Sequence, residues 1–195
     1  MDAFETAHNF TARWEGGWSN HKDDPGGATM LGVTQRTYDR WRVSRGLPTR
    51  SVRHITKPEA LAIYREDYWQ PVRGAELPVP LAIVVYDIAV NAGPGRAIRM
   101  LQAAVGAGVD GQFGPRTLAA MRARYERSPR RVIYELGLRR LLHWSSLRHF
   151  ATFRDGWFRR GLDLMIEAGQ LLKAEQNRRL SLSVGSGGIA HDQRT

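Results

Sequence analysis

The chain has 195 residues, of which 42% are hydrophobic, with no cysteine and a formal net charge of +10. Its length suits one domain or two tightly joined lobes, and its composition suits an ordinary hydrophobic core. The absence of cysteine excludes disulfides and thiolate chemistry, and no apolar run is long enough to span a bilayer.

The positive charge is concentrated in one part of the chain. Residues 116–160 hold twelve arginines and no lysine, against three acidic residues, Glu126, Glu135 and Asp155. Such a segment can form solvated helix faces, or it can attract a polyanion such as a cell-wall polymer, an acidic lipid surface or nucleic acid. Charge alone does not choose between these.

The first predicted helix begins at a capping box. Asp2 and Glu5 have the required spacing, and apolar residues then recur with helical periodicity. The pair Gly16-Gly17 is expected to end this helix, because glycine readily takes a positive φ. Glu15 would then lie in the last turn, and residues 18–33 would form an irregular loop or a short hairpin.

Two further helix starts follow. Thr34 is placed to cap a helix that runs through Trp41. Thr56 and Glu59 form a second capping box, and the helix that they open should end before Pro71.

Residues 79–91, VPLAIVVYDIAVN, are apolar on nearly every side. The β-branched run would also suit a strand. We favour a buried central helix, because Asp87 and Asn91 lie one turn apart and Gly93-Pro94 follows as a stop signal.

The rest of the chain is predicted to form helices separated by turns. They cover residues 96–106, a segment that begins near Pro115, a long segment from Ser128-Pro129 to about Phe150, and residues 156–180. The small and polar residues 181–195 are expected to be disordered.

Glu15 is the first candidate for chemistry. Trp14 and Trp18 flank it and would exclude water, and the helix end places partial negative charge beside it. Both surroundings favour the neutral, protonated carboxyl, which is the form that a general acid needs. A lone glutamate at a helix end is, however, more often a simple solvated side chain.

A second polar group follows across the loop. A glycosidase needs a proton donor on one side of the scissile bond and a second group opposite it, which activates water or stabilises positive charge. Asp24 can supply that group, with Asp23 as the alternative. Asp24-Pro25-Gly26-Gly27 is a turn whose glycines leave room for a sugar ring, and Thr29 can orient a water. By itself this turn would equally suit an ordinary surface loop.

Three motifs occur in order here, Glu15-Gly16-Gly17-Trp18, Asp24-Pro25-Gly26-Gly27-Ala28-Thr29 and Gly32-Val33-Thr34-Gln35. Together with residues 64–69 and 87–94, they resemble the signature of glycoside hydrolase family 108, the lysozyme-like N-acetylmuramidases of phages and bacteria. The resemblance implies a mainly α, lysozyme-like fold with two lobes around a cleft. It implies cleavage of the β-1,4 bond between N-acetylmuramic acid and N-acetylglucosamine, with Glu15 as the catalytic acid.

The order of Glu15, Asp24 and Thr29 also resembles the catalytic triad of phage lysozymes, so these three are the expected catalytic residues. The residues expected to contact substrate are Trp18, Gly26, Gly27, Tyr68 and Asn91. Whether the anomeric centre is inverted or retained depends on the distance between the two carboxyl groups.

A second resemblance lies toward the C-terminus. Leu101-Gln102 and residues 109–117, VDGQFGPRT, are similar to the core of small peptidoglycan-binding domains, in a turn where Asp110 can accept bonds from nearby backbone N–H groups. A turn with only a structural role could have the same sequence pattern. Residues 156–160, GWFRR, resemble the terminal motif of the hydrolase family. We therefore predict three parts, namely a catalytic muramidase lobe at 1–93, a helical peptidoglycan-binding-like lobe with Arg-rich helices at 94–180, and a disordered tail at 181–195.

The resemblance predicts a peptidoglycan muramidase that serves as an endolysin or in wall remodelling. We expect a monomer with no cofactor and no metal, since the histidines lack ligand spacing. Its expected partner is peptidoglycan, with the basic helices attracted to an anionic envelope surface. The N-terminus, MDAFETAHNF, lacks the pattern of a secretory signal. We therefore expect synthesis in the cytoplasm and action on the cell wall, by an export route that is left open.

Three alternatives remain. A lytic transglycosylase would also use one glutamate but would give anhydro products. A non-catalytic peptidoglycan-binding protein would leave Glu15 idle. A basic nucleic-acid binder is disfavoured, because no recognition helix is recognisable.

Overall fold

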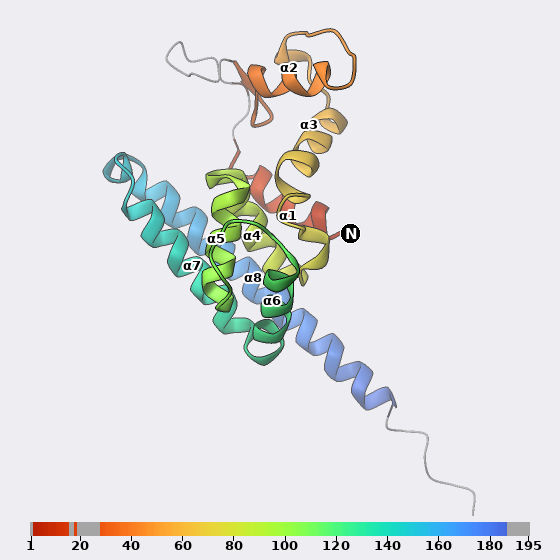
Figure 1. Cartoon of the computed structure of the whole chain (residues 1–195), viewed down its shortest axis with the longest axis vertical. Helices are drawn as coiled ribbons and strands as arrows, with labels where there is room; N and C mark the ends of the chain where they lie inside the picture. Colours follow the sequence, from red (N-terminus) through yellow and green to blue (C-terminus); the bar gives the residue numbers. More distant parts are fainter. Residues whose placement is uncertain (1, 16–17, 19–27, 187–195) are drawn as a thin grey trace, which may run out of the picture.

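The computed structural model describes residues 2–15, 18 and 28–186, with side chains through Leu182. This part of the chain is mainly α-helical, as predicted (Figure 1). Its helices are Ala3–Ala12 (α1), Gln35–Val43 (α2), Lys57–Tyr64 (α3), Val79–Ala92 (α4), Pro94–Val105 (α5), Pro115–Arg127 (α6), Pro129–Ser145 (α7) and Phe150–Ser186 (α8). Its shorter elements are the strands Thr29–Met30 (β1) and Val33–Thr34 (β2) and the single turns Val52–His54 (η1), Arg65–Trp69 (η2) and Gly74–Glu76 (η3).

Helix α1 has the predicted capping box at its start, but it ends at Ala12, before the glycine pair. Its last turn tightens, because the N–H groups of Arg13 and Trp14 bond the carbonyls three residues back, at 3.2 and 2.9 Å. Glu15 therefore follows the helix in a bend. Its own N–H still reaches the carbonyl oxygen of Thr11, at 3.2 Å.

The short hairpin that the sequence left as one of two possibilities is present at β1 and β2. Thr29 lies opposite Thr34 in the antiparallel register. The two turn residues, Leu31 and Gly32, have φ values of 52° and 71°. A two-residue hairpin turn of this kind requires positive φ at both positions, so the chain reverses within two residues.

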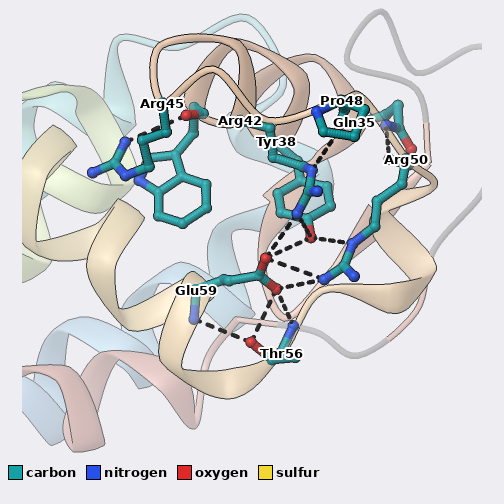
Figure 2. Close-up of polar contacts among 9 residues, drawn as sticks. Gln35, Tyr38, Arg42, Arg45, Pro48, Arg50, Thr56 and Glu59 are labelled. Carbon is teal, nitrogen blue, oxygen red and sulfur yellow. Dashed lines mark hydrogen bonds and ion pairs between the residues drawn. The ribbon is translucent and has the colours of Figure 1, made fainter.

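A polar cluster fastens α2 to α3 (Figure 2). The buried Tyr38 donates a hydrogen bond to Oε1 of Glu59 at 3.0 Å, and Arg42 and Arg50 both bind the same carboxylate. Thr56 donates to Glu59 through its N–H and its hydroxyl, which closes the predicted capping box of α3. One carboxylate thus fixes two helices and the segment between them.

Helix α4 is the centre of the molecule, as predicted. Residues 80–89 are all buried. The helix packs against α1, α5, α7 and α8, which surround it in Figure 1. Buried hydrophobic residues before and after Gly93, where α4 ends, belong to one continuous core. The division of the chain into lobes at residues 93 and 94 stays a prediction.

Helices α7 and α8 run side by side, and α8 continues past the body of the molecule (Figure 1). Two glycines let them approach closely. A Cβ added at Gly137 would lie 2.6 Å from Sδ of Met165, and one added at Gly161 would lie 3.1 Å from the ring of Trp144. The break between the helices falls before Phe150, earlier than predicted, and α8 continues beyond residue 180 to Ser186. Residues 187–195 of the predicted tail lie outside the described residues.

Candidate functional site

Glu15 borders a cavity between α1, α3 and the hairpin turn. The cavity has a volume of about 360 Å³, within the range of small-ligand pockets. The Glu15 side chain is 25% exposed, so it is accessible from solvent yet partly shielded. The other residues that line the cavity are His8, Ala12, Leu31, Lys57, Ala60, Leu61 and Tyr64.

The hairpin turn packs directly on this acid. A Cβ added at Gly32 would lie 2.1 Å from the hydroxyl oxygen of Tyr64 and 3.2 Å from Cβ of Glu15, so the turn needs glycine here. Tyr64 donates a hydrogen bond to the carbonyl oxygen of Leu31 at 3.3 Å. Burial raises the pKa of Tyr64, and the charge of Glu15 adds to this, so the phenol stays neutral. The turn, α3 and Glu15 are thereby fixed relative to one another.

An arginine from the far end of the chain holds Glu15. Nη2 of Arg160, on α8, lies 2.9 Å from Oε1 of Glu15 and 2.8 Å from Oδ1 of Asp87. Nε of Arg160 donates to the other oxygen of Asp87 at 3.2 Å. The Arg160 side chain is only 8% exposed. Water therefore screens this contact little, and charge-assisted hydrogen bonds are strong in such surroundings.

Asp87 is the buried anion at the centre of this network. It is fully buried on α4, accepts a hydrogen bond from the hydroxyl of Thr11 at 2.9 Å and forms an ion pair with Arg140 of α7. Burial alone would raise the pKa of Asp87. The charges of Arg140 and Arg160 outweigh burial and hold the pKa below its usual range. Asp87 is therefore a carboxylate that joins α1, α4, α7 and α8 beside Glu15.

The sequence does not single out Arg140 or Arg160 among the many arginines of residues 116–160. Arg160 is separated from Glu15 by 145 positions, so no local spacing connects them. The one available signal is the GWFRR stretch that ends at Arg160.

His8 is a further site residue that the sequence does not reveal. Its Nδ1 lies 2.9 Å from the hydroxyl of Tyr86, and its ring meets the edge of Tyr64 with 4.8 Å between ring centres. Burial lowers the pKa of His8 to about 4, and the charge of Lys57 contributes to this. The imidazole is therefore neutral near pH 7 and gives the cavity an uncharged polar group.

Three other predicted residues lie in described parts of the chain. Thr29 begins β1 and is half-buried. Trp18 is 41% exposed, and the guanidinium of Arg53 lies 4.7 Å from its ring centre. Tyr68, on η2, lies 5.6 Å from the ring of Tyr64, and burial raises the pKa of Tyr68. None of the three is among the residues that line the cavity, so their roles stay predictions.

Asn91 has a partner within the protein. Its side-chain oxygen accepts a hydrogen bond from the indole N–H of Trp144 at 2.9 Å, which links the end of α4 to α7. The structure thus gives Asn91 a packing contact, and a substrate contact stays a prediction. The other predicted site residues lie outside the described residues, namely Asp23, Asp24, Gly26 and Gly27.

The predicted turn before α6 is built around the buried Gln102. Its Oε1 accepts the N–H groups of Asp110 and Gly111, at 3.1 and 2.9 Å. Its Nε2 donates to Oδ1 of Asp110 at 2.6 Å and to the hydroxyl of Thr117 at 3.0 Å. As predicted, Asp110 accepts a backbone N–H, that of Gln112 at 2.8 Å. These bonds set the position at which α6 begins.

Within the described ranges, no three or more His, Asp or Glu side chains gather as a metal site would require. No helix in those ranges combines the length and apolar character needed to cross a bilayer. A carboxyl group that borders a cavity, as Glu15 does, can exchange a proton with a bound molecule, and the guanidinium of Arg160 beside it stabilises the charged form.

Comparison with known proteins gives two family matches. The family model described as glycosyl hydrolase 108 matches residues 8–93, and the one described as a predicted peptidoglycan domain matches residues 96–161. Among solved structures, the chain is similar to Brucella abortus SagA, with 38% sequence identity and a TM-score of 0.74, over 86% of this chain and 94% of that one. No curated protein matches the sequence. Glu15 and Asp87 fall in the first matched region, and Arg140 and Arg160 fall in the second.

Proposed function

This chain belongs to the glycosyl hydrolase 108 family, and we propose that it hydrolyses the β-1,4 bond between N-acetylmuramic acid and N-acetylglucosamine, with Glu15 as the general acid. Family membership makes it a glycoside hydrolase of mainly α, lysozyme-like fold, and the peptidoglycan domain beside it makes the cell wall its place of action. The observation that carries the proposal is the position of Glu15, half-buried at an open cavity and held by Arg160.

Arg160 holds Glu15 through one carboxyl oxygen and leaves the other for the proposed proton. Arg160 binds Oε1 of the carboxyl, so we assign the proton to the other oxygen, Oε2. As the glycosidic bond lengthens, Glu15 passes this proton to the bridging oxygen, and the leaving sugar departs as an alcohol. Arg160 then stabilises the carboxylate that remains. Arg160 is in this account a positioning residue, because it acts through Glu15 and not on the sugar.

The second half of the reaction needs a group on the other side of the bond. We propose Asp24 for it, with Asp23 as the alternative and with Thr29 to orient the attacking water. Thr29 is two residues before the turn that packs on Glu15, which supports a place for it near the acid. We propose that sugar contacts come from Trp18, Gly26, Gly27, Tyr68 and Asn91.

We further propose that the protein acts as a monomer without a cofactor, either as an endolysin or in wall remodelling. Product analysis of purified peptidoglycan tests the reaction. Hydrolysis at the proposed bond releases fragments with N-acetylmuramic acid at the reducing end. Anhydro ends would instead identify a lytic transglycosylase, and binding without release of sugar would identify a non-catalytic wall protein. Reducing N-acetylglucosamine ends would reject the choice of bond.

A further inference from the structure

A second and larger cavity is lined by residues from the end of α5, from α6 and from α7, and it shares no lining residue with the cavity at Glu15. Its volume is about 520 Å³. All of its lining residues fall in the region that matches the predicted peptidoglycan domain. The cavity is lined by Ala103, Ala104, Val105, Gly106, Ala120, Ala123, Arg124, Arg127, Glu135 and Arg139.

Three guanidinium groups and one carboxylate border this cavity. Glu135 is already paired with Arg131, at 2.8 Å, on the same helix. Arg139 makes a long contact of 3.9 Å with the same carboxylate and donates a bond of 3.4 Å to the carbonyl oxygen of Ala103. Its buried Nε has no hydrogen-bond partner in the described part of the chain.

Arg124 and Arg127 extend from the last turns of α6. Within the described residues, neither guanidinium has an ion pair or a hydrogen bond. Their place near a helix C-terminus gives them a favourable interaction with the helix dipole, but it leaves their donor groups unused. The cavity therefore carries excess positive charge and free N–H donors.

The floor of the cavity is made of small apolar groups, four of them alanine methyls, from Ala103, Ala104, Ala120 and Ala123. Such a floor can take a compact, partly apolar ligand, and a cavity of this volume is in the range that holds one. The guanidinium group matches the geometry of a carboxylate, which it can bind through two parallel hydrogen bonds. The site thus suits a short anionic peptide with small side chains.

We propose that this cavity binds the carboxylates of the peptide stems of peptidoglycan. This rests on the proposed function, because it assumes peptidoglycan as the substrate. The amino sugars of the glycan strand carry no free carboxylate once the stem is attached, whereas the stem carries several and is rich in alanine. The second domain therefore recognises the peptide part of the wall, while the Glu15 cavity acts on the sugar part.

The test is binding of a soluble stem tetrapeptide, L-alanyl-γ-D-glutamyl-diaminopimelyl-D-alanine, to the full chain by isothermal titration calorimetry. The variant combines Arg124→Gln and Arg127→Gln, which removes both free guanidiniums from exposed or half-exposed positions. The matched control is Arg116→Gln, which removes an exposed arginine from the same helix but outside the cavity. We expect at least tenfold weaker binding in the double variant, wild-type affinity in the control, and weaker wild-type binding as salt is raised.

Absence of wild-type binding would overturn the proposal, and so would equal affinity in the double variant. Binding of an uncharged N-acetylglucosamine oligomer or of polyphosphate as tightly as the tetrapeptide would also overturn it, in favour of a sugar site or a general polyanion site. Hydrolysis of stem-free glycan strands separates this proposal from the proposed function. That reaction depends on Glu15 and should be unchanged in the double variant.

Discussion

Asp87→Asn is the most direct test of the buried ion pairs that Asp87 forms with Arg140 and Arg160. Asparagine keeps the size of the side chain and removes its charge. Arg160 would keep Glu15 as a partner, but Arg140, whose side chain is 3% exposed, would lose its ion pair with Asp87. A buried guanidinium without a compensating anion lowers the stability of the fold, because the group has lost its hydration and no carboxylate takes the place of the lost water contacts.

The size of the effect follows from this burial. Removing one partner of a buried ion pair costs about 3–5 kcal/mol, and we expect about 4 kcal/mol because Asp87 is fully buried and also binds Thr11. For a chain of this length, that corresponds to a fall in melting temperature of about 8–16 °C. Asp155→Asn is the control. Asp155 is 84% exposed and only contacts Arg154 at 3.4 Å, so its loss should change the free energy of unfolding by less than about 0.5 kcal/mol.

Urea denaturation followed by circular dichroism between pH 3 and pH 7 measures both variants. The pKa of Asp87 is lower in the folded protein than the ordinary aspartate value of 3.8, so the folded protein binds this proton more weakly than the unfolded chain. The stability due to Asp87 is therefore present above pH 3.8 and is lost as the pH falls through the folded pKa. The difference between wild type and Asp87→Asn should shrink in acid.

A loss of less than about 1 kcal/mol at pH 7, close to that of the Asp155 control, would refute this reasoning. A second variant tests whether the unpaired guanidinium of Arg140 causes the loss of stability. Adding Arg140→Met to Asp87→Asn removes the unpaired charge and should recover part of the stability. A double variant no more stable than Asp87→Asn would show that the buried guanidinium is not the source of the cost.

Two further predictions concern the residues around Glu15. Arg160→Lys keeps the charge but loses the planar group that spans Glu15 and Asp87. We therefore expect at least a tenfold lower kcat/KM on purified wall and an altered pH profile of that activity. A lower rate with an unaltered pH profile would mean that Arg160 has only a structural role. In the unfolded chain His8 gains a proton as the pH falls below about 6.5, whereas in the folded protein its pKa is about 4. The wild type should therefore lose about 1–2 kcal/mol of stability between these pH values, which allows for the partial exposure of the ring. His8→Phe should lack that loss, and parallel curves of stability against pH for the two proteins would contradict the burial of a neutral imidazole.

Helix starts were predictable because their signals are local. Each of these signals lies within four consecutive residues. They are the capping boxes at Asp2 and Thr56 and the prolines at the starts of α6 and α7. The burial of α4 was predictable too, since a helix that is apolar on all sides has to be enclosed. Helix ends were less predictable, because they depend on tertiary packing as well as on glycine and proline. Helix α1 accordingly stops at Ala12, short of its glycine pair.

The site divides in the same way. The motif around Glu15 points to it as the candidate acid, because the residues that form the motif are adjacent in sequence. Arg160 and Asp87 reach Glu15 only through the packing of α8 against α4, and nothing in the local sequence records that packing. His8 lies on an ordinary amphipathic helix, and its neutral state depends on Tyr64, Tyr86 and Lys57 closing around it.

The most direct test of the proposed chemistry is the rate at which Glu15→Gln releases sugar from purified peptidoglycan. Glutamine can still accept the hydrogen bond from Arg160 but carries no proton for the bridging oxygen, so we expect an unchanged circular dichroism spectrum and a rate lower by about 10²–10⁴-fold. Glu167→Gln, at a partly exposed residue that contacts Arg13 at 3.5 Å, should retain the wild-type rate. A folded Glu15→Gln protein that digests the wall nearly as fast as wild type would contradict the assignment of Glu15 as the acid.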